Sequence, residues 1–206
     1  LGLGAWRLAR AKVLARSIPA VELLGATTVL CVDKTGTLTA NHMAVRRLWA
    51  EAASFDTAAA ESAPLQEALH PLLEFAVLAS HRRAFDPMET AIGAAGRRLL
   101  ADTEHLHGDW TVVDDYPPSR EMLAMSRVWQ SPADGPEARE RVIAAKGAPE
   151  AIVDLCHLGA QRQAAIAAQV ALFAAEGLRV LGVARARCVV DLLPELQHGF
   201  DFEFLR

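Results

Sequence analysis

The sequence predicts an α+β fold, an antiparallel β-sheet flanked by helices, on the basis of two patterns. First, segments with strand character follow one another in runs instead of alternating singly with helices. These segments are residues 110–115, 122–129, 141–145 and 178–190. Second, segments with helical character are grouped between the runs, at residues 71–80, 86–100, 149–156 and 161–175. Runs of strands with grouped helices are typical of antiparallel sheets, whereas parallel sheets alternate strand and helix.

Local signals set the ends of these helices. Pro71 stands at a first helical position, where its missing N–H costs nothing. Asp86 and Glu89 form an N-terminal capping arrangement, because an Asp side chain there accepts from the free amides of the first turn. Gly177 ends the last of these helices, as glycine commonly does. The Pro- and Gly-containing residues 131–136 predict a turn between two strands.

The two ends of the chain have different patterns. Residues 1–25 carry apolar residues at helical spacing with basic residues between them, so we expect mostly helix. The β-branched run 27–32 predicts a buried parallel strand. Residues 43–49 predict a short strand, and the Ala-rich, polar residues 51–62 predict a loop or an insertion. Residues 200–205 alternate like a strand.

Composition narrows the class of protein. In a chain of 206 residues, a hydrophobic content of 52% allows a sizeable core, and we expect one domain plus a piece of a second. A net charge of −4 without a basic stripe argues against a nucleic-acid partner. The three cysteines form no metal or disulfide pattern, which fits a reducing compartment. No apolar run reaches the ~20 residues that span a bilayer, so we expect a soluble chain whose membrane part, if any, lies outside it.

The most informative segment reads Asp33-Lys34-Thr35-Gly36-Thr37-Leu38-Thr39. It follows the predicted parallel strand directly, and open α/β sheets bind ligands at the carboxyl ends of such strands. Gly36 allows a tight turn around a bound group, the threonines add hydroxyls, and Lys34 adds a positive charge. Together these residues predict a carboxylate nucleophile, Asp33, inside a cradle of the size of a phosphate group.

This run resembles the phosphorylation motif of P-type ATPases, ion pumps that form an aspartyl-phosphate intermediate, and matches it completely. The resemblance implies that Asp33 accepts the γ-phosphoryl group of ATP, with Lys34 and Mg²⁺ neutralising the charge. It also implies a phosphate loop of Thr35, Gly36 and Thr37, with Mg²⁺ ligands at Asp33 and the Thr35 carbonyl. Soluble phosphatases of the haloacid-dehalogenase type carry a second Asp at the position of Thr35, so we expect slow hydrolysis of the aspartyl phosphate here.

The resemblance implies a division of the chain into four parts. These are a stalk helix end at 1–25, the first segment of the phosphorylation domain at 26–41, the nucleotide-binding domain at 42–195, and the start of the return to the phosphorylation domain at 196–206. The antiparallel sheet is then a nucleotide-binding domain inserted in an incomplete haloacid-dehalogenase-like α/β domain. The implied partners are ATP, the remaining phosphorylation, actuator and transmembrane domains of the same pump, and a transported cation, calcium being the first expectation. The chain is then expected on the cytoplasmic side of the cell membrane.

Further matches imply nucleotide-binding residues. Glu89, in the run Asp-Pro-Met-Glu-Thr-Ala, matches a Glu near the adenine, although the capping arrangement by itself needs no ligand. Lys146 and Gly147 open the run Lys-Gly-Ala-Pro-Glu, whose Lys lies at the bottom of the family's nucleotide pocket. Arg179 matches an Arg that reaches the phosphates; without that match, pairing with an acidic neighbour explains it equally well.

Residues 116–126 resemble the segment that surrounds the adenine with an aromatic and basic residues, and here the chain departs from the family pattern. The expected aromatic falls on Pro118 and an expected Lys on Leu123. Tyr116 is then the candidate stacking residue and Arg120 the candidate positive charge.

Two other functions stay open from the sequence. One is a free-standing haloacid-dehalogenase-type phosphatase with a cap domain, against which Thr35 argues. The other is a non-catalytic nucleotide-binding or interaction module. Because the family motifs that complete the Mg²⁺ site and drive dephosphorylation are missing from the sequence, we expect this chain to bind ATP without pump-like turnover. His105 and His107 have no third ligand at metal-binding spacing, so we expect a solvated loop there.

Overall fold

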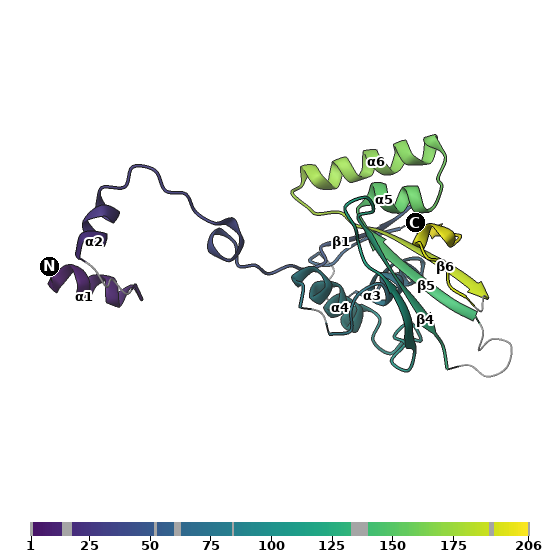
Figure 1. The fold of residues 1–206 in the computed structure, drawn as a ribbon. Coiled ribbons are helices and arrows are strands. Elements are labelled where there is room, and N and C mark those ends of the chain that lie inside the picture. The colour runs from purple at the N-terminus through teal and green to yellow at the C-terminus, as the bar shows by residue number, and fades with distance from the viewer. Residues whose placement is uncertain are drawn as a thin grey trace. The chain divides into compact units, whose positions relative to one another are not determined.

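A computed structural model of the chain describes residues 2–13, 18–51, 53–59, 63–83, 85–132, 140–189 and 192–205. The chain divides into two units, Leu1–His42 and Met43–Arg206, and Figure 1 labels most of their helices and strands. No helix among the described residues is both long enough and apolar enough to cross a membrane.

Among its described residues, the first unit contains two short α-helices. Helix α1 covers Gly2–Arg10 and α2 covers Ile18–Gly25, so the helical prediction for this part is confirmed in two pieces. The strand predicted at 27–32 is not formed, and Val29 within it is 77% exposed. A parallel strand needs neighbouring strands and cover on both faces, and no described segment pairs with this run. The prediction of a buried strand is therefore wrong for this chain.

The second unit is built on a five-stranded antiparallel sheet with the strand order β3-β4-β5-β6-β7. Its strands are β3 Thr111–Tyr116, β4 Ala124–Gln130, β5 Glu140–Gly147, β6 Gly182–Val189 and β7 Glu203–Phe204. A separate hairpin pairs β1, Arg47–Ala50, with β2, Ala53–Asp56. The helices are α3 His70–Leu78, α4 Pro87–Leu99, α5 Pro149–Leu155 and α6 Ala160–Ala175. This arrangement confirms the predicted α+β fold with its antiparallel sheet.

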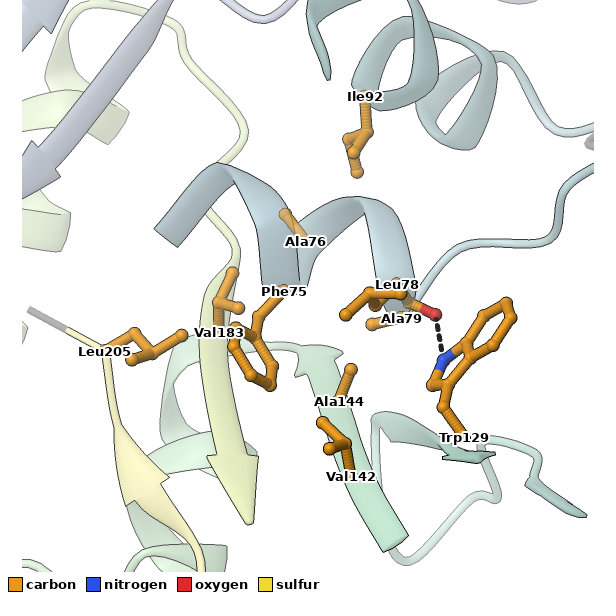
Figure 2. Close-up of a cluster of buried hydrophobic side chains, with 10 residues drawn as sticks. All are labelled: Phe75, Ala76, Leu78, Ala79, Ile92, Trp129, Val142, Ala144, Val183 and Leu205. Atoms are coloured by element: carbon orange, nitrogen blue, oxygen red, sulfur yellow. Dashed lines mark hydrogen bonds between the residues drawn. The ribbon is translucent and has the colours of Figure 1, made fainter. Parts of the chain in front are cut away.

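Helices cover both faces of the five-stranded sheet, as the alternation along β5 shows. Ala144 packs in a first cluster with α3 and α4, whereas the next residue, Ala145, packs in a second cluster with α5. In the first cluster Phe75 of α3 lies against the strands, and the Trp129 indole N–H donates to the Leu78 carbonyl over 2.9 Å (Figure 2). A third cluster joins the β1–β2 hairpin to α3 and α4. The sheet is thus the middle layer of the second unit.

Two predicted segments differ in extent from the observed ones. Residues 51–62, expected to be a loop, contain strand β2, because the hairpin buries Phe55 in the third cluster. Residues 178–181, expected to open a strand, precede β6, whose first residue paired with β5 is Gly182. They leave the sheet here and line a cavity instead.

The last residues stay with the second unit. Within 196–206, expected to begin the return to another domain, β7 pairs with β6 and Leu205 is buried in the first cluster. The strand character predicted at 200–205 is limited to the two residues of β7. The turn predicted at 131–136 lies mostly outside the described residues.

Candidate functional site

Lys146, the last residue but one of β5, is the centre of a buried polar group. Its side chain is 3% exposed, and Nζ donates to Glu89 Oε1 (2.5 Å), Ser80 Oγ (2.8 Å) and the Ala79 carbonyl (2.9 Å). These partners come from the residues just after α3 and from the first turn of α4. Because an ammonium group has three N–H donors, Lys146 is fully satisfied inside the protein.

Glu89 is fixed in place by the start of α4. Asp86 Oδ1 accepts from the backbone N–H groups of Met88 (2.9 Å) and Glu89 (3.2 Å), which confirms the predicted N-cap. From this turn Oε1 reaches Lys146, and Oε2 lies 3.0 Å from His81 Nδ1. Glu89 therefore belongs to a helix cap and to a buried ion pair at once.

In the Lys146–Glu89 pair, burial and the opposite charge shift the pKa of each side chain in opposite directions. Burial acts to raise the pKa of the Glu89 carboxyl, but the hydrogen bonds and charges of Lys146 and His81 outweigh it and hold the pKa below its usual value. Burial lowers the pKa of Lys146, and the Glu89 carboxylate opposes that shift. The two side chains thus depend on each other in a place where water solvates neither well.

A largely apolar cavity of about 230 Å³ opens beside this group. Its walls come from residues 43–49, from helices α3, α4 and α6, and from residues 178–183. Phe173 of α6 and Leu181 are two of the apolar side chains in the lining. Such a concave, mostly apolar space with a few charged groups at its edge is the usual form of a small-molecule site.

Four cationic side chains of the described residues line this cavity, and they differ in whether they form an ion pair with a carboxylate. Lys146 is paired with Glu89. Arg46 and Arg47 are paired with carboxylates, Arg46 with Asp56 of β2 at 3.1 Å and Arg47 with the residue after α6 at 2.9 Å. Arg179 is exposed, and no described residue forms an ion pair or a hydrogen bond with its guanidinium. Arg179 is therefore available to an anionic ligand.

Gly147 and Tyr116 have roles in packing the sheet. A Cβ at Gly147 would collide with the Leu123 carbonyl, so glycine is needed for β5 to approach β4. Tyr116 donates its hydroxyl to the Pro194 carbonyl (2.6 Å), and its ring packs with the second cluster, on the face of the sheet opposite to Lys146. The structure does not bring Tyr116 to the group around Lys146. Arg120 is exposed in the connection between β3 and β4.

The predicted phosphorylation motif lies in the first unit. Residues 34–38 form an irregular turn, in which Gly36 has a φ of +79° that glycine adopts without strain. The Thr39 N–H closes the turn by donating to the Lys34 carbonyl (3.0 Å). Asp33, Thr35 and Thr37 are exposed on and beside this turn. The motif residues therefore belong to a different unit from the group around Lys146.

A second buried polar group did not follow from the sequence. Glu74 of α3 lies 2.6 Å from His105 Nδ1 and 2.7 Å from His107 Nε2, which come from the loop after α4. The imidazoles are 21% and 16% exposed, so the expectation of a solvated loop is wrong for them. At least 31 positions separate the Glu from either His, which leaves no local signal. Within the described part of the chain, no group of three or more His, Cys, Asp or Glu residues is suited to hold a metal ion.

Comparison with known protein families identifies the class of protein. The model of a family described as "P-type ATPase, cytoplasmic domain N" matches residues 80–203, which is more than half of the 206 residues. The chain therefore belongs to the P-type ATPases. The matched range includes Glu89, Lys146 and Arg179.

The chain is similar to several ATPases named as cation transporters. The probable cation-transporting ATPase F of Mycobacterium bovis is 31% identical over 214 residues, covering 88% of this chain and 23% of that protein. A calcium-transporting ATPase of Bacillus subtilis is 27% identical over 181 residues, 74% of this chain and 19% of the relative. Calcium-transporting ATPase 1 of Saccharomyces cerevisiae is 55% identical over 49 residues, 24% of this chain and 5% of the relative. The chain thus spans less than a quarter of the length of these curated relatives.

Proposed function

We propose that the second unit binds ATP as the nucleotide-binding domain of a cation-transporting P-type ATPase. The observation that carries this proposal is the apolar cavity that borders both the Lys146–Glu89 pair and the free guanidinium of Arg179. A nucleotide combines a flat apolar base with a polyanion, and this cavity offers a place for each. The family of the chain and the names of its relatives support the same function.

The residues around the cavity have distinct tasks in this proposal. Arg179 offers its planar fork of donors to phosphate oxygens, which a guanidinium matches in geometry. Lys146 lies in the cavity wall, where its ion pair with Glu89 joins the first turn of α4 to the end of β5. Gly147 allows the close approach of β5 and β4 beside this wall. Arg120, exposed before β4 and outside the cavity lining, is proposed as a positive charge near the adenine.

We propose further that Asp33 accepts the γ-phosphoryl group of ATP in the whole pump. A carboxylate oxygen of Asp33 attacks the γ-phosphorus in line, the bond to the bridging oxygen breaks, and ADP leaves with that electron pair. Lys34 and the Thr37 hydroxyl stabilise the charge that develops on the phosphoryl oxygens. With Thr35 in place of a general acid or base, water has no activated route to the product, which favours a pump over a phosphatase.

Magnesium is the metal that this chemistry calls for. Asp33 and the Thr35 carbonyl are exposed on the motif turn, and both are the hard oxygen ligands that Mg²⁺ prefers. Mg²⁺ keeps several waters and takes phosphate oxygens, so two protein ligands on an open turn fit it. When bound, the ion neutralises phosphate charge; Asp33 and Lys34 orient the group to be transferred.

The transport function is proposed from the relatives. Calcium is named for two of them and a cation for the third, so a cation, with calcium first, is the expected cargo. The site for that cation, the actuator domain and the rest of the phosphorylation domain belong to the longer pump. The second unit is then expected on the cytoplasmic side of the membrane.

Calorimetry of the whole chain with ATP and Mg²⁺ tests the binding proposal. We expect R179A to weaken ATP binding about tenfold, because charged hydrogen bonds to phosphate are lost. Arg162→Ala, an exposed Arg in α6 outside the cavity lining, is the matched control and is expected to leave the affinity unchanged. Absence of ATP binding by the unmodified chain would overturn the proposal.

Labelling with γ-³²P-ATP tests the proposed role of Asp33. In the whole pump we expect acid-stable label that is lost in D33N, with loss of ATP hydrolysis. For the chain alone we expect nucleotide binding without steady hydrolysis, since its motif turn is exposed and unsupported by a sheet. Steady turnover of a small phosphoester by the chain would favour the phosphatase instead.

A further inference from the structure

Arg47, in the cavity lining, joins two parts of the second unit that are 129 positions apart in the sequence. It is the first residue of β1, and its Nη1 donates to Glu176 Oε1 over 2.9 Å. Its guanidinium also lies 5.3 Å from the centroid of the Phe173 ring, within the range of a cation–π contact. Asp56 Oδ2 of β2 lies 3.7 Å from Nη2. Arg47 therefore holds the carboxyl end of α6 against the β1–β2 hairpin.

A Schellman motif ends α6 at the same place. The Gly177 N–H donates to the Ala174 carbonyl over 2.9 Å. The Leu178 N–H donates to the Phe173 carbonyl over 3.1 Å. Gly177 has a φ of +79°, which glycine adopts without strain. These two hydrogen bonds and the left-handed glycine are the features of the motif, and they set the direction in which the chain leaves the helix.

Arg179 follows this motif directly. It lines the cavity, and no described residue forms an ion pair or a hydrogen bond with its guanidinium. The place of the guanidinium at the cavity therefore depends on the backbone that carries it. That backbone is anchored before Arg179 by the motif and by the bond from Arg47 to Glu176. After Arg179 it is anchored by β6, which begins at Gly182.

We propose that Arg47 and Glu176 are positioning residues of the nucleotide site, which act through Arg179. Their ion pair holds the end of α6, and with it the start of the segment 177–181, so that the Arg179 guanidinium is in place before ATP binds. This inference rests on the proposed function, because Arg179 is the proposed phosphate ligand of that site. A segment that is already held in its binding position loses less conformational entropy when the ligand arrives. Neither Arg47 nor Glu176 needs to contact the nucleotide for this effect.

The negative charge of Glu176 distinguishes a positioning role from a simple effect of charge. Glu176 is paired with a cation of the cavity lining, so its carboxylate repels phosphates that bind in the cavity. By electrostatics alone, removal of this carboxylate tightens ATP binding. Loss of the ion pair, however, releases the end of α6, and Arg179 must then be ordered when ATP binds. A positioning role therefore predicts weaker binding where electrostatics alone predicts tighter binding.

Titration calorimetry of the whole chain with ATP and Mg²⁺ tests this role. We expect E176A to raise the Kd for ATP about threefold, because the segment that carries Arg179 loses its anchor. In the R179A background the same change should not raise the Kd further, because the residue through which the ion pair acts is gone. Since the ion pair can be lost only once, R47M/E176A should bind ATP no more weakly than R47M.

Glu195→Ala removes another exposed carboxylate, outside the cavity lining, and is the matched control that should leave the Kd unchanged. An E176A variant that binds ATP as tightly as the unmodified chain, or more tightly, would overturn the inference and leave the nucleotide site standing. The same rise of the Kd with and without Arg179 would also overturn it, because Glu176 would then act on the fold. If the unmodified chain binds no ATP at all, the proposed function fails, and this inference fails with it.

Discussion

Lys146 holds three separate parts of the second unit together through one nitrogen atom. Replacing it with Met keeps most of the volume but leaves the Glu89 carboxylate, 9% exposed, without its cation. Breaking a buried ion pair by removing one partner is strongly destabilising, so we expect K146M to lose about 3 kcal/mol of unfolding free energy. Urea denaturation followed by circular dichroism measures this loss.

The control for that variant is a cation of the same cavity, Arg179, that has no partner among the described residues. R179M removes a guanidinium that is exposed, so its unfolding free energy should change by less than about 0.5 kcal/mol. In the double variant K146M/E89Q the buried charge is gone as well, and the total loss should be smaller than the sum of the single losses. An unchanged stability of K146M would show that the pair contributes nothing to the fold.

At the scale of elements, Glu74 ties the loop after α4 to helix α3. Burial acts to raise the pKa of Glu74, but the hydrogen bonds and charges of His107 and His105 outweigh it and hold the pKa below its usual value of 4.5. A carboxyl group of this kind stabilises the fold above that usual value and loses the effect as the pH falls through its lowered pKa. We expect E74Q to be less stable by about 2 kcal/mol at pH 7, with a difference that shrinks below about pH 4.5.

Thermal unfolding of both proteins between pH 3 and pH 8 measures that difference. Glu67→Gln, an exposed acid just before α3, is the matched control and should follow the unmodified chain at every pH. A stability gap for E74Q that persists unchanged to pH 3 would contradict the role of the carboxylate charge.

Helices and strands of this chain differ in how well the sequence predicts them. Helix α4 follows from the sequence because its cap, its proline and its apolar spacing lie within a few residues of one another. Strand β2 does not follow from the sequence. It depends on the burial of one side chain, Phe55, and the residues that bury Phe55 come together only in the folded unit. The run 27–32 has strand composition without strand partners, so composition alone gives the wrong answer there.

The candidate site likewise contains residues that the sequence indicated and residues that only the structure reveals. The resemblance pointed to Glu89 and Lys146 separately, and the structure joins them over 2.5 Å. Ser80 and His81 had no signal, because their place in the site depends on the end of α3 lying over β5. Tyr116 has the right chemistry for stacking, but alternation along β3 turns it to the face opposite Lys146.

At the scale of the whole molecule, the proposed nucleotide site and the proposed phosphoryl acceptor, Asp33, belong to different units. All three hydrophobic clusters and every residue around the cavity lie within residues 43–206. A chain shortened to 43–206 should therefore keep the melting temperature of the whole chain within about 2 °C and bind ATP with the same Kd. D33N in the whole chain should likewise leave the Kd unchanged. Calorimetry measures the Kd, and thermal unfolding measures the melting temperature. Weaker ATP binding or a clearly lower melting temperature for 43–206 would show that residues 1–42 support the nucleotide site, and would contradict the independence of the second unit.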